Sequence, residues 1–273
     1  MQDLKHWSVS IDDANLCWLT LDVSGKSVNV LTHAVMAELG QIIDWVESQS
    51  IIAGVGMLSG KPGGFVYGAD IAEFELLATA GDVLQHMQMV HALFNRIDSL
   101  DVPTIVGIDG IAVGGGLEIA LTFDRIITTA SPKTKLGFPE VNLGILPGYG
   151  GSGRAYRRIG TAAVTQMMMS GRPLTASAAK AAGLIDQTVD DAAALQPAMT
   201  SWLTAQNRAK PHRQQRETAA DQKALDDASA QFLTRLRADH TPAPFAIIEH
   251  VRRYGHDAAA MSAGEMNIFP ELM

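Results

Sequence analysis

Two glutamates and a run of glycines are the part of this sequence best suited to chemistry. The glycines Gly114 to Gly116 are followed by Glu118, and Glu140 stands 22 residues further along the chain. Two carboxylates in different surroundings can divide acid and base work, because one donates a proton while the other accepts one. The pair therefore indicates proton transfer next to a carbonyl group, provided that the fold brings both side chains together.

The glycines lie where a strand is expected to give way to a helix. Ile105 to Ile108 is short, apolar and rich in β-branched residues, as a buried parallel strand would be, and Leu117 to Leu121 fits a mostly buried helix. Such a turn exposes backbone N–H groups at the positive end of the helix, where a negative oxygen can be held. A packing interpretation stands beside this one, since glycine-rich turns often serve close packing and a first-turn glutamate complements the helix dipole.

The spacing of apolar residues predicts an α/β core built from repeated β-β-α or β-α units. Strands are expected at Trp7 to Ile11, Leu16 to Leu21, Gly54 to Ser59, Thr104 to Ile108, Arg125 to Ala130 and Leu184 to Val189. Helices are expected at Val35 to Val46, residues 82 to 100, from Gly116 onward, Thr161 to Ser170 and Thr175 to Ala182. Thr175 is a suitable helix cap and Gly183 a suitable helix end.

The composition of the chain excludes several classes of protein. The chain has 273 residues and a net charge of −8, which argues against nucleic acid or an anionic membrane as a partner. Its single cysteine, Cys17, cannot form an intramolecular disulfide and fits a small core residue better than a nucleophile. No stretch of about 18 apolar residues occurs, and the first 30 residues do not resemble a signal peptide. We therefore expect a cytoplasmic protein that does not insert into a membrane.

A second glycine-rich segment imitates a nucleotide-binding motif. Gly148 to Gly153 matches GxGxxG, but Pro147 directly precedes it and no acidic residue occurs from Val141 to Ile185. A dinucleotide site needs a strand before the glycines and an acidic residue about 20 positions later, so we expect no nicotinamide cofactor. The sequence has no HExxH or CxxC motif, which predicts that no metal is bound. His86 and His91 are expected to be structural.

The composition changes near residue 192. Beyond it glycine is absent until Gly255 and helical spacing prevails, with helices expected at residues 217 to 239 and 245 to 254. The basic run Asn207 to Arg216 is broken by Pro211 and is interpreted as a solvated linker rather than an anion site. We therefore divide the chain into a catalytic core, residues 1–191, and a C-terminal helical region, residues 192–273.

Four segments of the sequence carry a resemblance to a known family. Ile108 to Glu118 and Pro139 to Gly151 resemble the enoyl-CoA hydratase/isomerase (crotonase) superfamily. Phe65 to Ile71 looks like that family's first oxyanion-hole segment, and Gly25 to Leu31 matches a further landmark near its start. The landmarks follow the family's order over roughly residues 8 to 190. Leu136 to Gly144 is similar to the hydratase part of bacterial multifunctional fatty-acid oxidation α-subunits.

The resemblance implies a fold and a division of catalytic roles. The fold would be a crotonase-like spiral of repeated ββα units, with C-terminal helices that cover the active site or make subunit contacts. The backbone N–H groups of Ala69 and Gly115 would hold the thioester oxygen as it gains charge. Glu118 would activate water and Glu140 would handle the proton on the α-carbon.

The resemblance also implies substrate and CoA contacts. The residues it marks are Lys26, Ser27, Val28, Tyr67, Ala69, Asp70, Gly115, Pro139 and Gly148. Two departures stand out: Ala72 replaces a lysine that many relatives use toward a CoA phosphate, and Tyr67 is bulkier than the small residue common there. CoA binding then rests on other groups, of which Lys26 is one candidate.

The function implied by this resemblance is hydration of 2-trans-enoyl-CoA in fatty-acid β-oxidation. Isomerisation of 3-enoyl-CoA to 2-enoyl-CoA is an alternative on the same site, and a non-catalytic acyl-CoA-binding or partner-binding module is an alternative of another class. No cofactor is expected, because coenzyme A belongs to the substrate. The expected partners are an acyl-CoA thioester and further copies of the chain, as a trimer or hexamer, or a larger fatty-acid oxidation enzyme.

Overall fold

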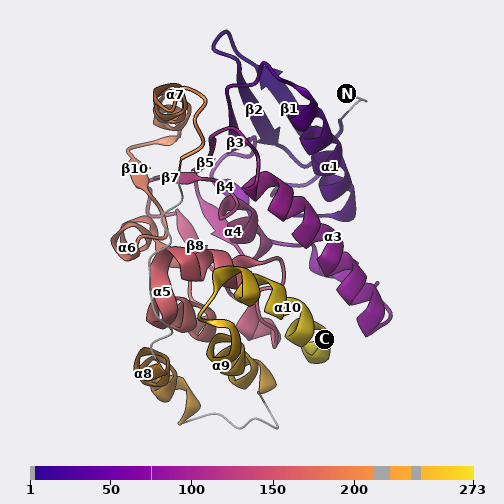
Figure 1. Ribbon diagram of the computed structural model, residues 1–273, viewed down its shortest axis with the longest axis vertical. Coiled ribbons are helices and arrows are strands. Elements are labelled where there is room, and N and C mark those ends of the chain that lie inside the picture. The colour runs from indigo at the N-terminus through magenta and orange to yellow at the C-terminus, as the bar shows by residue number, and fades with distance from the viewer. Residues whose placement is uncertain (1–3, 75, 212–221, 235–240) are drawn as a thin grey trace.

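A computed structural model describes residues 4–74, 76–211, 222–234 and 241–273 and shows a mixed α/β fold (Figure 1). The strands are β1 Trp7–Ile11, β2 Leu16–Leu21, β3 Gly54–Ser59, β4 Gly64–Val66, β5 Thr104–Ile108, β6 Ile111–Val113, β7 Arg125–Thr129, β8 Lys135–Gly137, β9 Leu174–Thr175 and β10 Gln187–Val189. The α-helices are α1 His33–Ser48, α2 Ile71–Phe74, α3 Ala80–Asp98, α4 Gly115–Ala120, α5 Gly151–Ser170, α6 Ala176–Ala182, α7 Leu195–Ala205, α8 Gln222–Leu233, α9 Pro242–Tyr254 and α10 Ala258–Leu272. Two 3₁₀-helices, η1 Glu140–Leu143 and η2 Ala192–Ala194, complete the described elements.

The larger sheet has the strand order β1-β2-β3-β5-β7-β10. β1 and β2 form an antiparallel hairpin, as expected, and the remaining neighbours pair in parallel. Every residue of β5 is buried, which explains its continuous apolar and β-branched sequence, because a central parallel strand is covered on both faces. The strands predicted in this sheet are present, but the last is shorter than predicted, because β10 begins at Gln187 rather than at Leu184.

The smaller sheet, with the order β4-β6-β8-β9, positions the candidate site. Its strands β4, β6 and β8 are parallel neighbours, and each follows a strand of the larger sheet, β3, β5 and β7 respectively. This pairing of a long and a short strand is the repeated unit expected from the sequence. Because parallel strands end at one edge of a sheet, the segments after β4, β6 and β8 meet there. They carry Ala69, Gly115 and Glu140.

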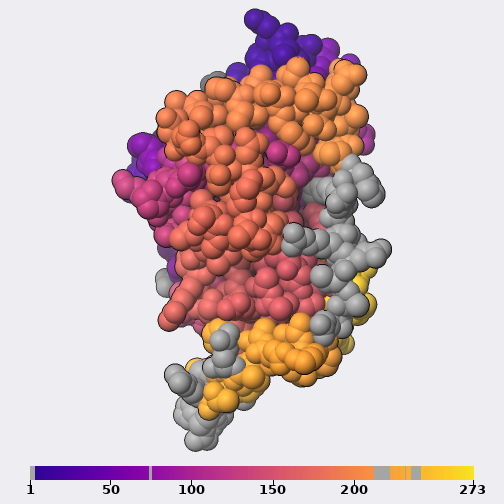
Figure 2. All heavy atoms as spheres, turned by 90° about the vertical axis from the view of Figure 1, so that its left-hand side faces the viewer, coloured from indigo at the N-terminus to yellow at the C-terminus, as the bar shows by residue number. Residues whose placement is uncertain are grey.

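The face of the larger sheet toward α7 has its own apolar cluster. Leu195, Met199 and Leu203 of α7 pack with residues of β2, β5 and β7, among them Trp18 and Ile105. Figure 2 shows this part of the chain, in orange, beside the N-terminal residues in indigo. α7 therefore lies against the larger sheet, although it follows residue 191. The division of the chain into a core and a C-terminal region at that residue stays a prediction.

The other C-terminal helices pack at the opposite end of the molecule, where α8, α9 and α10 contact α5 (Figure 1). α9 begins at Pro242, earlier than expected, because prolines are tolerated in the first helical turn. α5 begins at Gly151 rather than at Thr161, and its two halves meet at a kink at Gly160, where φ is 77°. The sequence did not indicate α10. The expected helix at residues 217–239 and the basic run to Arg216 lie partly outside the described residues.

Candidate active site

A pocket of about 370 Å³ opens at the carboxyl ends of β4, β6 and β8. Seven of the residues predicted from the sequence line it together: Tyr67, Ala69, Gly115, Glu118, Pro139, Glu140 and Gly148. Phe269 of α10 and Ile145 add apolar surface to the same wall. The pocket thus combines two carboxyl groups with a mostly apolar lining, which suits an uncharged acyl chain beside an acid–base centre.

The backbone segments that carry Ala69 and Gly115 lie close together. In the short pairing between Leu31 and Ala69, the Leu31 N–H donates to Gly68 O at 2.8 Å and the Asp70 N–H donates to Leu31 O at 3.2 Å. The Ala69 N–H therefore points to the opposite side of the chain, where the pocket lies. A Cβ built on Gly115 would lie 3.3 Å from Ala69 N, so the two segments are in contact. The contact between these segments is what a two-donor oxyanion hole requires, and the assignment of the Ala69 and Gly115 N–H groups as its donors stays a prediction.

The glycines before α4 are required by this close approach. Gly114 has φ 53°, a left-handed conformation that favours glycine, and a Cβ there would lie 2.9 Å from Glu140 Oε1. At Gly116 a Cβ would lie 2.1 Å from Val66 O in β4. Side chains at these positions would push α4 away from the smaller sheet, and with it Glu118.

Glu118 is buried and well provided with donors. Its side chain is 2 % exposed, and its Oε1 accepts hydrogen bonds from Tyr149 N at 2.7 Å and Gly151 N at 2.9 Å. Burial raises the pKa of Glu118 to about 7, while these N–H groups limit the rise because they stabilise the ionised form. The carboxyl group can therefore be ionised near neutral pH, as a general base must be.

Glu140 has different surroundings. It begins η1, is 8 % exposed, and its Oε2 has no hydrogen-bond partner among the described residues. Burial, and then the negative charge of Glu118, raise the pKa of Glu140 well above its usual range. The protonated form of Glu140 is therefore favoured more than that of an exposed glutamate, which suits a proton donor.

The predicted CoA contacts divide into two groups. Lys26, Ser27, Val28 and Asp70 are absent from the described lining of the pocket, unlike Tyr67, which is 38 % exposed there. Lys26 forms a salt bridge with Asp70, and its ammonium group holds the pKa of that carboxyl below the usual range. Lys26 is thus already paired with Asp70, the residue that follows Ala69 in the chain.

Tyr149 and Phe269 line the pocket but were missed from the sequence. Tyr149 is buried, and its hydroxyl is 2.8 Å from His86 Nε2. The position of Tyr149 next to Gly148 in the glycine-rich turn was the feature of the sequence that could have indicated its place in the pocket. No comparable signal existed for Phe269, whose helix was not expected. His91 Nε2 is 3.0 Å from Gly148 O, so both histidines hold the turn, as a structural role requires.

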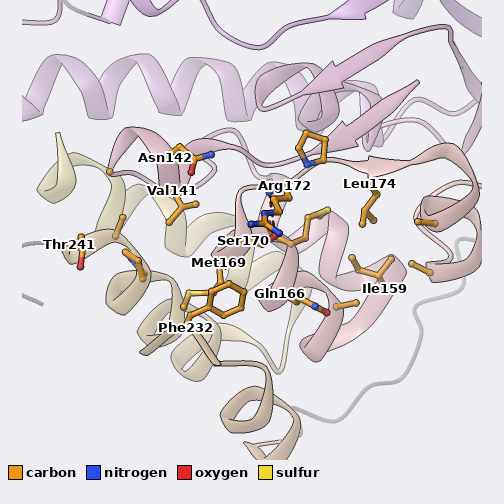
Figure 3. Close-up of a pocket in the computed structure, with 18 of the residues that line it drawn as sticks. Val141, Asn142, Ile159, Gln166, Met169, Ser170, Arg172, Leu174, Phe232 and Thr241 are labelled. Atoms are coloured by element: carbon orange, nitrogen blue, oxygen red, sulfur yellow. Dashed lines mark hydrogen bonds between the residues drawn. The ribbon is translucent and has the colours of Figure 1, made fainter. Parts of the chain in front are cut away.

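A larger pocket lies on the other side of η1 (Figure 3). It measures about 1010 Å³ and is lined by the second half of α5, β9, α8, α9 and the η1 residues Val141 and Asn142. Arg172 is the one charged residue of its described lining, and neither Glu118 nor Glu140 reaches it. Size alone therefore does not mark the reactive site, because this pocket lacks acid–base groups.

The described residues include neither a metal-binding cluster of side chains nor a membrane-spanning helix. No group of three or more His, Cys, Asp or Glu side chains is placed to hold a metal ion in this part of the chain. No helix within the described ranges is both long and apolar enough to cross a membrane.

Comparison with known proteins agrees with the geometry. A sequence model of the family "Enoyl-CoA hydratase/isomerase" matches residues 12–242. The α-subunit of the fatty acid oxidation complex of Shewanella halifaxensis is 32 % identical over 255 residues, and that of Shewanella amazonensis is 33 % identical. Each match covers 91 % of this chain but 36 % of the relative, so the chain spans about a third of these relatives' length.

Solved structures share the fold. An enoyl-CoA hydratase from Geobacillus kaustophilus superposes with a TM-score of 0.70 at 21 % identity, over 97 % of this chain and 89 % of that one. An enoyl-CoA hydratase from Bacillus anthracis superposes with a TM-score of 0.68 at 22 % identity, over 96 % of this chain and 90 % of that one. The fold is that of the crotonases. The chain belongs to the enoyl-CoA hydratase/isomerase family.

Proposed function

We propose that this protein is an enoyl-CoA hydratase that adds water across the double bond of a 2-trans-enoyl-CoA in fatty-acid β-oxidation. The observation that carries the proposal is the pair of buried carboxyl groups with unlike surroundings in one pocket. Membership of the enoyl-CoA hydratase/isomerase family and the names of the Shewanella relatives support the same substrate class.

The reaction follows from the geometry of the pocket. Glu118, as the ionised base, takes a proton from water while the hydroxide oxygen bonds to the β-carbon. The electrons of the double bond move toward the thioester carbonyl, whose oxygen is held by the N–H groups of Ala69 and Gly115. Glu140 then gives its proton to the α-carbon, and the two carboxyl groups exchange a proton, directly or through water, to reset the site.

Preorganised donors matter here because they need no reorganisation as charge develops. Loss of one oxyanion-hole donor typically costs about 3 kcal/mol of transition-state stabilisation. Both donors in this site are main-chain groups, so replacement of the Ala69 side chain leaves the N–H in place. Their contribution is better tested by changes that move the backbone.

Hydration of crotonyl-CoA tests the proposal directly. The conjugated thioester absorbance should fall when the purified protein is added, and Glu118→Gln should abolish most of that loss. A non-catalytic module would instead bind acyl-CoA without any loss of absorbance. Tight acyl-CoA binding with no turnover in the wild-type protein would contradict the proposed hydratase.

Double-bond isomerisation is a second candidate that one feature favours. In its ionised form Glu140 alone can take a proton from the α-carbon of 3-enoyl-CoA and return it to the γ-carbon, because isomerisation adds no water. The unpartnered Glu140 Oε2 in the described pocket suits such a shuttle. A 3-enoyl-CoA substrate converted to the 2-enoyl isomer at a rate comparable with hydration would assign both activities.

Neither reaction should need a metal or nicotinamide cofactor. Chelator treatment followed by desalting is expected to leave hydration of crotonyl-CoA unchanged. Abolished turnover that added metal restores would contradict the acid–base mechanism.

A further inference from the structure

The turn before α5 is held from two sides by buried carboxyl groups. On the pocket side, Glu118 Oε1 accepts the N–H groups of Tyr149 and Gly151. The intervening residue Gly150 has φ 87°, so the chain reverses its direction there and the next N–H group faces the other way. The two N–H groups that donate to Glu118 therefore stay in position only while this turn keeps its conformation.

The opposite side of the turn faces Glu265 of α10. Glu265 is fully buried, and its carboxyl oxygens accept Gly150 N at 2.5 Å and Ser152 N at 2.8 Å. The Ser152 hydroxyl also donates to Glu265. Four consecutive backbone N–H groups thus alternate between the two acids, two to each.

Further contacts tie α10 to the same turn. Ser262 Oγ donates to Gly150 O at 3.0 Å, and a Cβ on Gly153 would lie 2.1 Å from Ala258 O. The first turn of α10 therefore packs directly on the start of α5. Any movement of α10 must move the turn, and any movement of the turn changes the two hydrogen bonds that Glu118 receives.

From this alternation we propose that Glu265 is a positioning residue, which holds Glu118 in its working geometry through the backbone of residues 149–152. The proposal rests on the proposed function, in which Glu118 activates water. Glu265 itself does not line the described pocket and touches no reacting atom. Glu265 holds the N–H groups of Gly150 and Ser152. Because these residues alternate with Tyr149 and Gly151, they fix the two N–H groups that donate to Glu118.

Groups from three helices surround Glu265. His91 Nε2 of α3 is 3.7 Å from Glu265 Oε2, and because burial lowers the pKa of His91 to about 4, this imidazole is neutral near pH 7. Arg154 of α5 contributes a positive charge to both Glu265 and Glu118. From α9, His250 Nε2 is 2.9 Å from the Ser152 hydroxyl. Burial, and then the charge of Glu118, raise the pKa of Glu265 well above its usual range, and the Ser152 hydroxyl and the Gly150 and Ser152 N–H groups oppose that rise. A glutamate side chain offers two oxygens to these donors, whereas an amide has one oxygen and an NH₂ that would face a backbone N–H.

The substitution that follows is Glu265→Gln, which keeps size but removes one acceptor from the turn. We expect kcat for crotonyl-CoA hydration to fall by about tenfold or more, because small misplacement of a catalytic group can cost up to about 10²-fold. KM should stay within about twofold, because Glu118 works on the attacking water rather than on substrate binding. The matched control is Glu271→Gln on the exposed face of the same helix, which should leave both constants unchanged.

A stability control separates positioning from a structural role. Ile247→Ala removes a fully buried side chain of α9 and should lower the melting temperature without lowering kcat. Equal losses of kcat in Glu265→Gln and Ile247→Ala at equal loss of melting temperature would overturn the proposal. So would a Glu265→Gln variant that behaves like Glu271→Gln while the wild type is active. A wild type without hydration would instead overturn the proposed function.

Should Glu265→Gln not fold, Ser262→Ala provides the same test in a milder form. It removes only the Ser262 Oγ–Gly150 O hydrogen bond from α10. We expect kcat to fall by about twofold or more with KM unchanged. An unchanged kcat in this variant would overturn the proposal.

Discussion

Glu118 and Glu140 line one pocket but are held in opposite ways. Glu118 stands on a helix, and its Oε1 receives two N–H groups from the turn before α5. Glu140 starts a 3₁₀-helix, and its Oε2 finds no partner among the described residues. Both are buried, so the difference between them lies in the hydrogen bonds offered to the charged form.

This difference assigns the two roles. Hydrogen bonds to a carboxylate favour its ionised form and offset the cost of burial, whereas burial without donors favours the protonated form. When two interacting acids share a site, ionisation of one further disfavours ionisation of the other. In the proposed mechanism the same residue type therefore supplies both the base and the acid.

The largest expected effect comes from removing either proton-transfer group. Glu118→Gln and Glu140→Gln should each lower crotonyl-CoA hydration by at least about 10²-fold, the usual range for a positioned acid or base. The double variant should be little worse than either single one, because groups that act as a unit are not additive. Acyl-CoA binding, measured in parallel, checks that the variants are folded.

Isomerisation sharpens this comparison, because it needs the α-proton but no water. Glu140→Gln should abolish isomerisation of 3-enoyl-CoA, and Glu118→Gln should spare more of it. Equal and mild losses of both reactions in both variants would mean that neither carboxylate has the role assigned here.

A smaller effect is expected from pH. Hydration needs Glu118 ionised, and its pKa is raised to about 7, so kcat/KM should rise with pH through that value. Well below it the rate should drop by about tenfold per pH unit. The proposed mechanism also needs Glu140 protonated, and burial raises its pKa well above the usual range, so the rate should fall again on the alkaline side. A rate that is flat from pH 5 to 9 would contradict the pairing.

The smallest effect concerns stability. The folded-state pKa of Glu140 lies above its ordinary value of 4.5, so folded protein retains a proton that unfolded chain has lost. The free energy of unfolding should therefore fall as pH rises from about 4.5 toward the folded pKa. Glu140→Gln removes the Glu140 part of this dependence, while Glu118 and Glu265, whose pKa values are also raised, keep theirs. The variant should have a higher melting temperature than wild type at pH 8, by about 2–4 °C for each kcal/mol regained. A melting temperature that is lower at pH 8 than in wild type would argue that Glu140 has an undetected ionic partner.

Much of the core could be predicted from the sequence, because there the local pattern of apolar residues matches the residues that the fold buries. The strands Gly54–Ser59 and Thr104–Ile108 have the predicted bounds, and Thr175 caps α6 as expected. The acids and glycines of the site were found because their types suit the chemistry and their order resembles a known family. That they meet follows from three parallel strands that end at one edge.

The remainder depends on tertiary contacts that spacing does not report. Glycines at the start of α5 hid its first half, since they lower helix propensity but are needed where Glu118 and α10 approach the turn. The small residues that open α10 gave no amphipathic pattern, so neither Phe269 nor Glu265 was indicated. The alternating N–H groups of residues 149–152 become visible only in three dimensions.

The central claim is that the two acids are in different protonation states at neutral pH. It can be tested in the ligand-free protein by ¹³C NMR titration of labelled glutamate carboxyl groups, assigned with the Glu118→Gln and Glu140→Gln variants. We predict that Glu118 titrates at about pH 7 and that Glu140 titrates well above its ordinary value, and the proposed mechanism requires Glu140 to keep its proton where Glu118 has lost its own. Both carboxyl groups ionised at pH 5, or Glu140 ionised while Glu118 keeps its proton, would contradict the account.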